Sequence, residues 1–105
     1  MIGINSLPPI MIVEGITVLA NQEINQICDL KIFVTMDEEN CLKRRLVRSY
    51  GNPDPPEYFK NFVWPTYQTY YQRLCEQQDI HFIDGCRPIH QNFLTLLKLT
   101  LSKLK

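Results

Sequence analysis

Three arginines, Arg44, Arg45 and Arg48, cluster near the middle of the chain. The stretch around them, residues 41–50, carries an apolar or aromatic residue at every fourth position from Leu42, which predicts a short amphipathic helix. Guanidinium groups at this spacing repel one another unless an anion or carboxylates lie among them, and their planar donors suit phosphate oxygens. The cluster therefore indicates an anion site, although a solvated cationic face beside the core explains the same pattern.

A second candidate for chemistry is Glu14, which follows the first apolar run of the chain. Residues 10–13 are apolar without alternation, a pattern typical of a strand buried on both faces in a parallel sheet. Glu14 would stand at the carboxyl end of that strand, the edge at which open α/β sheets bind ligands. A solvated or capping glutamate at a strand end is the alternative.

Several elements must position these side chains. Residues 21–28 predict a short helix, and residues 30–34 predict a second strand. Asp37 is predicted to cap the arginine helix, because its carboxylate can accept hydrogen bonds from the first free amide groups. Residues 51–56, rich in proline with one glycine, predict a loop after that helix.

The second half of the chain continues the alternation. Asp54 is predicted to cap a third helix, in which Pro65 should cause a kink. Residues 81–83 predict a third strand, and Pro88 is predicted to open a final helix. Strands that alternate with helices indicate an α/β fold whose parallel strands are joined by right-handed crossovers.

Two helices carry hydrophobic stripes that are expected to face the core. In the third helix the stripe is largely aromatic, and it comprises Phe59, Val63, Tyr67, Tyr70 and Leu74. In the final helix it comprises Phe93, Leu97, Leu101 and Leu104. Stripes at this spacing are typical of buried helix faces, more often than of cofactor stacks.

Composition narrows the class of protein. The 105 residues suit one small domain, and eleven basic residues balance eleven acidic ones, so no overall field attracts nucleic acid or an anionic membrane. No apolar run reaches the length of a membrane span, and the first residues lack a secretion-signal pattern. We therefore expect a cytoplasmic protein without nucleic-acid or membrane partners.

The cysteines argue against a zinc site. They occur singly at positions 28, 41, 75 and 86, without Cys-x-x-Cys spacing and without histidines at metal-ligand spacing. Thiols of this kind are typically reduced and mostly buried in cytosolic proteins.

Blocks of the sequence resemble the uridine kinase and nicotinamide riboside kinase group. The shared blocks begin with residues 12–15, 29–34 and 41–50. The blocks that favour nicotinamide riboside kinase follow in order, and they are Arg48-Ser49-Tyr50, Pro53-Asp54, Tyr58-Phe59, Val63-Trp64-Pro65, Tyr67 and Asp84-Gly85.

This resemblance implies a fold and a reaction. Such kinases are P-loop proteins with a three-layer architecture around a five-stranded parallel sheet. They transfer the γ-phosphoryl group of ATP to the ribose 5′-hydroxyl of nicotinamide riboside and require Mg²⁺. By this resemblance, residues 41–56 would form a mobile lid over the nucleotide.

The resemblance also implies roles for single residues. The ATP-binding residues would be Arg44, Arg48, Ser49, Tyr50, Arg87, Pro88 and Ile89. The riboside-binding residues would be Arg45, Tyr50 and Gly51. Glu14 would lie near Mg²⁺ and act through water.

The departures from the family pattern affect catalysis. The four glycines, at positions 3, 15, 51 and 85, form no Gly-x-x-x-x-Gly-Lys-Ser/Thr loop, and the family's aspartate base and riboside-binding Tyr-Asp pair have no counterpart. Gly51-Asn52 also stands where the family favours Gln-Pro, which affects the expected riboside contact. We therefore expect residues 1–105 to be a single partial domain, the C-terminal half of the fold, with no catalytic base of its own.

Loss of that half would also leave the sheet incomplete. In the family's strand order the missing first strand lies between the predicted strands 10–13 and 30–34. Their edges would then stay unpaired, pair with each other, or be completed by another chain such as a full-length kinase.

Two functions from different classes follow. The first is a nicotinamide riboside kinase-like chain that is inactive alone because the phosphate cradle is absent. The alternative is a non-catalytic module that binds a nucleotide or a partner. Binding of nucleic acid by the basic helix is disfavoured by the balanced charge.

Overall fold

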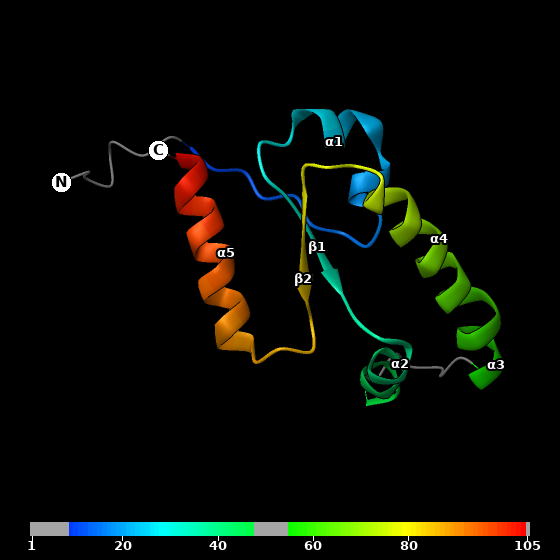
Figure 1. Cartoon of the computed structure of the whole chain (residues 1–105). Helices are drawn as coiled ribbons and strands as arrows, with labels where there is room; N and C mark the ends of the chain where they lie inside the picture. Colours follow the sequence, from blue (N-terminus) through cyan, green and yellow to red (C-terminus); the bar gives the residue numbers. More distant parts are fainter. Residues whose placement is uncertain (1–8, 48–54, 105) are drawn as a thin grey trace.

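The computed structural model describes residues 9–47 and 55–104, which form an α/β arrangement of two strands and several helices (Figure 1). The first elements along the chain are the 3-10 helix η2 (Val18–Ala20), α1 (Gln22–Ile27), β1 (Lys31–Thr35) and α2 (Glu38–Val47). The later elements are α3 (Pro56–Tyr58), the π-helical turn η3 (Phe59–Val63), α4 (Trp64–Cys75), β2 (Ile80–Asp84) and α5 (Ile89–Leu104).

The sheet consists of β1 and β2, which run parallel in continuous register from Lys31 opposite Ile80 to Thr35 opposite Asp84. The helices α2 and α4 lie between them in the sequence, as a parallel pair requires, because a tight turn cannot connect two parallel strands. The predicted strands at 30–34 and 81–83 and the parallel α/β class are therefore confirmed within a residue or two.

The predicted first strand is wrong. Residues 10–13 form no hydrogen-bonded strand, and Met11 and Ile12 are 89% and 84% exposed. A strand exists only by pairing with another, and β1 pairs with β2 rather than with this segment. Glu14 consequently lies in an exposed, irregular stretch and not at the end of a strand.

The core lies where α4 covers one face of the sheet. Phe33 of β1 is buried beneath three aromatic side chains of α4, with ring centroids 6.0 Å from Tyr67, 5.6 Å from Tyr70 and 6.1 Å from Tyr71. Leu74 is also buried in this cluster. The prediction that the aromatic stripe forms core is confirmed.

Local signals in the sequence explain where several helices begin. Asn21 caps α1 by accepting a hydrogen bond from the Ile24 amide at 3.1 Å, and Asp37 caps α2 by accepting one from the Asn40 amide at 2.7 Å. Asp54, the other predicted cap, lies outside the described residues.

Pro65 does not break the long helix that follows. The π-helical turn η3 precedes it, and its widened spacing lets the Trp64 amide bond to the Phe59 carbonyl oxygen. A π-helical turn of this kind lets the chain pass the proline, which has no amide hydrogen to donate. The predicted irregularity therefore lies just before Trp64 and not after it.

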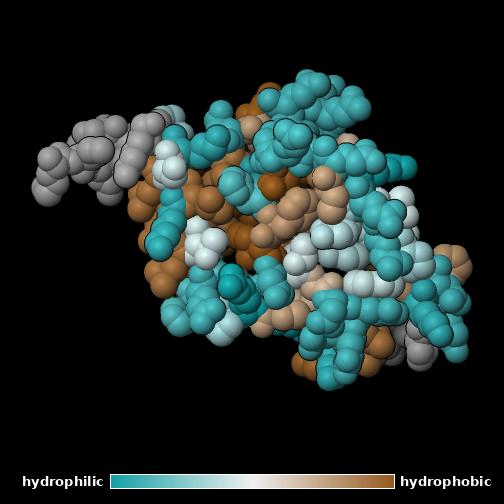
Figure 2. Space-filling model, viewed as in Figure 1, coloured by the Kyte–Doolittle hydropathy of each residue, from teal (hydrophilic) through white to brown (hydrophobic). Residues whose placement is uncertain are grey.

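The final helix is present, but its predicted burial is wrong. Phe93, Leu97 and Leu101 of α5 are exposed, and Leu104 is only half-buried. In the space-filling view, hydrophobic residues gather on the side of the molecule where α5 lies (Figure 2). Periodicity identified the apolar face of this helix correctly, but nothing among the described residues covers it.

The predicted burial of the cysteines also fails, and two apolar helix residues are exposed. These residues are Leu46 of α2 and Ile27 of α1. No disulfide joins the four cysteines, but none of them is buried, since Cys28 and Cys41 are half-buried and Cys75 and Cys86 are exposed. Within the described ranges, no helix has the length and apolar character needed to cross a membrane.

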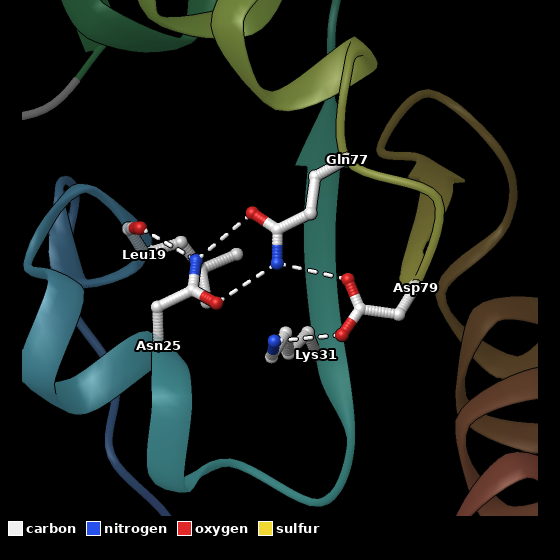
Figure 3. Close-up of polar contacts among 5 residues, drawn as sticks. All are labelled: Leu19, Asn25, Lys31, Gln77 and Asp79. Atoms are coloured by element: carbon white, nitrogen blue, oxygen red, sulfur yellow. Dashed lines mark hydrogen bonds and ion pairs between the residues drawn. The ribbon is translucent and has the colours of Figure 1, made fainter.

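A polar network links side chains at the amino ends of the two strands (Figure 3). The Lys31 ammonium group donates to the Asp79 carboxylate at 2.7 Å, and Gln77 Nε2 donates to the other oxygen of Asp79 at 2.8 Å and to Asn25 Oδ1 at 2.8 Å. Asn25 Nδ2 in turn donates to the Leu19 carbonyl oxygen at 2.8 Å. The network thus ties α1 and β1 to the turn that precedes β2.

Candidate functional site

The opposite, carboxyl ends of β1 and β2 meet at a tight junction. The Gly85 amide donates to the Thr35 carbonyl oxygen at 2.7 Å, which brings the chain after β2 directly against the end of β1. A Cβ at position 85 would lie 2.9 Å from that oxygen and 2.9 Å from Val34 Cγ1. Only glycine permits this approach, so the Asp84-Gly85 pair has a structural reason beyond sequence resemblance.

Two carboxylates flank this junction. Asp37 follows β1 and accepts hydrogen bonds from the amide and the side chain of Asn40 at 2.7 and 2.8 Å, while the Cys86 thiol lies 3.6 Å from it. These bonds, led by the one from the Asn40 amide, lower the pKa of Asp37 below its usual value. Asp84 ends β2 and accepts from the Cys86 amide at 2.8 Å. Both carboxylates are thereby oriented by short local hydrogen bonds.

Arg44 reaches this junction from α2. Its Nη2 donates to the Gly85 carbonyl oxygen at 3.1 Å, across 41 positions of sequence. The side chain is exposed, so its remaining donors are accessible to a ligand. One guanidinium of the arginine cluster therefore lies at the carboxyl edge of the sheet.

Arg87 belongs to the same loop. Its amide donates to the Asp84 carbonyl oxygen at 3.2 Å, and Pro88 and Ile89 follow it into the first turn of α5 with exposed side chains. The structure thus brings Arg44 to the loop that carries Arg87, although the two are far apart in the sequence.

The other predicted site residues are distributed differently. Arg45 is half-buried and is not free, because it already interacts with another group of the protein. The remaining predicted contacts fall outside the described residues, and they are Arg48, Ser49, Tyr50 and Gly51.

An open cavity of ≈ 430 Å³ lies beside the junction. Its lining combines polar and aromatic side chains at the carboxyl ends of the strands, namely Thr35, Met36, Asp37, Trp64, Tyr67, Gln68, Tyr71 and Asp84. Trp64 and Tyr67 are stacked with ring centroids 4.8 Å apart. Burial raises the pKa of Tyr67, although its hydroxyl accepts a hydrogen bond from the Met36 amide, so this side chain stays neutral near pH 7.

Sequence reasoning missed this cavity as a site. The available signal was the position of Thr35, Asp37 and Asp84 directly at the ends of two predicted parallel strands, because such ends meet at one edge. The aromatic wall could not have been added in this way, since Trp64 and Tyr67 reach the edge only through the packing of α4 on β1.

The described residues do not by themselves fit a Mg²⁺ site. Among residues 9–47 and 55–104, no group of three or more His, Cys, Asp or Glu side chains is placed to hold a metal ion. Glu14 offers a single exposed carboxylate, so a Mg²⁺ ion near it would take most of its six oxygen ligands from water and from substrate phosphates. Residues 9–47 and 55–104 therefore supply no complete metal site.

Comparison with known proteins decides the family. The family described as Phosphoribulokinase / Uridine kinase family matches residues 4–85, most of the chain. The chain belongs to this family. Nicotinamide riboside kinase 1 of Mus musculus is 38% identical over 80 residues, which cover 75% of this chain and 41% of the mouse protein. Nicotinamide riboside kinase 1 of Homo sapiens is 34% identical over 100 residues, which cover 91% of this chain and 49% of the human protein.

A second human relative extends this pattern within the phosphoribulokinase / uridine kinase family. Nicotinamide riboside kinase 2 of Homo sapiens is 30% identical over 90 residues, which cover 85% of this chain and 39% of that protein. No solved structure gives a significant match. The resemblance to nicotinamide riboside kinases is thereby confirmed, and the chain spans about half the length of the curated relatives it matches or less.

Proposed function

We propose that this chain forms part of the nucleotide-binding site of a kinase that phosphorylates nicotinamide riboside to nicotinamide mononucleotide with ATP. The observation that carries the proposal is the Arg44–Gly85 hydrogen bond, which holds a guanidinium at the carboxyl edge of a parallel sheet. Ligands of open α/β sheets bind at this edge, and guanidinium groups suit phosphates. The names of the relatives supply the substrate.

In this proposal the arginines act by charge and position. Phosphoryl transfer depends mainly on alignment and on stabilising the charge that spreads over the transferred group. Arg44 and Arg48 would contact the phosphates with Ser49 and Tyr50, and residues 87–89 would border the adenine. Arg45, Tyr50 and Gly51 would contact the riboside, and Glu14 would approach Mg²⁺ through water.

We expect the 105 residues alone to have no kinase activity, either in the cytoplasm or as a purified chain. They contain no Gly-x-x-x-x-Gly-Lys-Ser/Thr sequence, so the backbone cradle and lysine that hold the β- and γ-phosphates in P-loop kinases are not supplied by these residues. These residues can bind part of a nucleotide but cannot align it for phosphoryl transfer.

A second candidate is a non-catalytic module that binds a nucleotide or a partner chain. The exposed apolar residues of α5 favour it, because a surface of this kind is typical of an interaction site. In this alternative the chain binds ATP without hydrolysing or transferring it, and adding another polypeptide does not restore catalysis.

Titration calorimetry with ATP at low salt tests the proposal. Arg44→Ala should weaken binding about tenfold, the effect of losing one charge-assisted contact. Lys43→Ala is the matched control, because Lys43 is an exposed cation on the same helix whose ammonium group pairs with Glu39 at 3.2 Å. It should change the affinity less than about twofold.

Two results would contradict the proposal. The first is absence of ATP binding by the unaltered chain, and the second is an equal loss of affinity in both variants, which would indicate unspecific attraction by charge. A phosphorylation assay with nicotinamide riboside then tests the inactivity of the isolated chain, and turnover above background would show that this part of the account is wrong.

A further inference from the structure

A second open cavity lies at the amino ends of the strands, opposite the edge where Arg44 meets Gly85. Its volume is ≈ 490 Å³, within the range of about 300 to 1,000 Å³ that small-molecule sites have in proteins. Residues of η2, of α1 and of the end of α4 with the turn that follows line it. The proposed function uses none of these residues, so the cavity is free to serve a different ligand.

Two helix faces form the walls of this cavity. Side chains three and four positions apart share one face of a helix. From α1, that face contributes Gln22, Asn25 and Gln26. From α4 and the turn after it, the face contributes Tyr70, Arg73, Leu74 and Gln77. The cavity is therefore a groove between two elements, and hydrogen bonds between Asn25 and Gln77 join its walls (Figure 3).

The groove carries a single charge. Among the described residues that line it, Arg73 alone is ionised at neutral pH, because burial raises the pKa of Tyr70 and keeps its hydroxyl neutral. The Arg73 side chain is exposed, and within the described part of the chain it makes no hydrogen bond or ion pair. Its planar set of N–H donors is thus available to an anionic ligand.

Asn25 and Gln77 have the opposite capacity. The Asn25 amide donates to the Leu19 carbonyl oxygen at 2.8 Å and to Gln77 Oε1 at 3.1 Å. The Gln77 amide donates to Asn25 Oδ1 and to Asp79 Oδ1, at 2.8 Å each. All their N–H groups are therefore used, but each amide oxygen has a second lone pair and can accept one further hydrogen bond. This part of the groove suits a ligand that donates.

The size of the charge and the floor of the groove narrow the ligand further. One guanidinium balances one carboxylate, whereas a phosphate group carries about 1.5 to 2 negative charges near pH 7. Leu19 and Leu74 line the groove from below and are buried, so its floor is apolar. The groove thus combines a site for one carboxylate, acceptors for an N–H group and a surface for a small aliphatic side chain.

We propose that this groove binds a carboxylate with an N–H donor on the neighbouring carbon, the arrangement of an N-acylated amino acid and of the carboxyl end of a peptide. Arg73 pairs with the carboxylate, and the exposed amides of Gln22 and Gln26 add donors beside it. The oxygens of Asn25 and Gln77 accept from the N–H group. A nucleotide triphosphate does not fit, because its negative charge exceeds what one guanidinium balances, so this site and the proposed nucleotide site are independent.

The test titrates the isotope-labelled full chain with N-acetylleucine and follows its amide resonances by NMR. We expect a dissociation constant of about 1 to 5 mM, as is typical of a ligand of about a dozen heavy atoms. Shifts should occur in residues 22–26 and 73–77 and not at Gly85. N-acetylleucinamide has nearly the same shape without the charge, and it should bind at least about fivefold more weakly.

Variants of the groove sharpen this test. Arg73→Gln should weaken binding about tenfold, because it removes the charge-assisted hydrogen bonds. The matched control is Lys60→Gln, which removes one exposed positive charge from η3 and should change the affinity less than about twofold. Gln26→Glu places a carboxylate in the groove and should weaken binding at least about fivefold by repulsion. The spectra of all three variants should retain the dispersion of the unaltered chain.

A longer probe separates the two sources of this chemistry. Tighter binding of N-acetyl-alanyl-alanyl-leucine than of N-acetylleucine would support the site as one for the carboxyl end of a polypeptide, and equal binding would support it as a small-molecule site. Absence of binding up to about 20 mM of either probe would overturn the proposal. Equal affinities for the acid and its amide, or equal losses in Arg73→Gln and Lys60→Gln, would overturn it as well.

Discussion

The two ends of the same small sheet are built in opposite ways. At the amino ends, Lys31, Gln77 and Asp79 bond to one another, so these side chains satisfy much of each other's hydrogen bonding, although Asp79 is exposed (Figure 3). At the carboxyl ends, the bonds run mainly to backbone groups, as from Arg44 to Gly85, and an open cavity remains beside them.

This difference assigns a role to each end. The network at the amino ends stabilises and fixes the strands, because its side chains bond mainly to one another. Asn25 and Gln77 also line an open cavity of ≈ 490 Å³ at this end. At the open end, short backbone bonds hold the side chains in place while exposed donors of Arg44 and the carboxylates of Asp37 and Asp84 face solvent. We therefore assign the anchoring role to the amino ends, and we propose the carboxyl ends, where the Arg44 guanidinium lies beside two carboxylates, as the nucleotide-binding edge.

The largest effect on stability should come from the core behind the anchored end. Leu74 is buried against Leu19 and Ile80, so Leu74→Ala removes packed methyl groups and leaves a cavity. We expect the free energy of unfolding to fall by about 3 kcal/mol. Urea unfolding followed by the fluorescence of Trp64 measures this, and a loss below about 1 kcal/mol would contradict the assignment of this end as the anchor.

The next effect should come from the network itself. Gln77→Ala removes two donated hydrogen bonds, to Asn25 and Asp79, and one that Gln77 accepts from the partly buried Asn25. The expected cost is about 1 to 2 kcal/mol in the same unfolding experiment. Gln78→Ala, at the exposed neighbouring position, should change stability by less than about 0.5 kcal/mol, and equal effects of both variants would show that the network is not an anchor.

Acid should weaken the anchored end in a specific way. The hydrogen bonds from Lys31 and then Gln77 lower the pKa of Asp79 below 3.8. The ionised carboxylate therefore stabilises the folded state above about pH 4, and this contribution is lost as the pH falls through the lowered folded-state pKa. Asp79→Asn should be less stable at pH 7 and show a flatter decline below pH 4, whereas parallel curves for the two proteins would refute the assignment.

The smallest effect should be local and lie at the open end. Asp37→Ala removes the cap of α2, so the Asn40 amide should exchange its hydrogen about fivefold faster. Glu38→Ala, an exposed acidic residue at the next position, should leave that rate nearly unchanged. Unchanged exchange in Asp37→Ala would mean that the cap does not hold the arginine helix in place.

The sequence was sufficient for elements whose signals are local. The apolar run of β1 and the cap at Asp37 depend on near neighbours, and both were predicted correctly. The run at residues 10–13 has an equally apolar composition, but a strand also needs a partner edge, and β1 pairs with β2 instead. The rest of the chain, and not the segment itself, decided that outcome.

The candidate site was predictable in part for the same reason. The pattern of α2 placed the arginines on one short helix, and the structure brings Arg44 to the Gly85 loop. The contribution of Trp64 to the cavity depends on how α4 packs against β1, which no local spacing encodes. Likewise, the apolar period of α5 identified a hydrophobic face but could not tell whether anything covers it.

The contrast between the two ends can be measured directly by titrating the isotope-labelled chain with ATP and following its amide resonances by NMR. We expect shifts at Gly85 and Arg87 and in α2 around Arg44, with the resonances of Asn25 and Gln77 unchanged. Resonance shifts at the amino ends, or shifts spread evenly over the chain, would contradict the claim that the nucleotide binds at the carboxyl edge of the sheet.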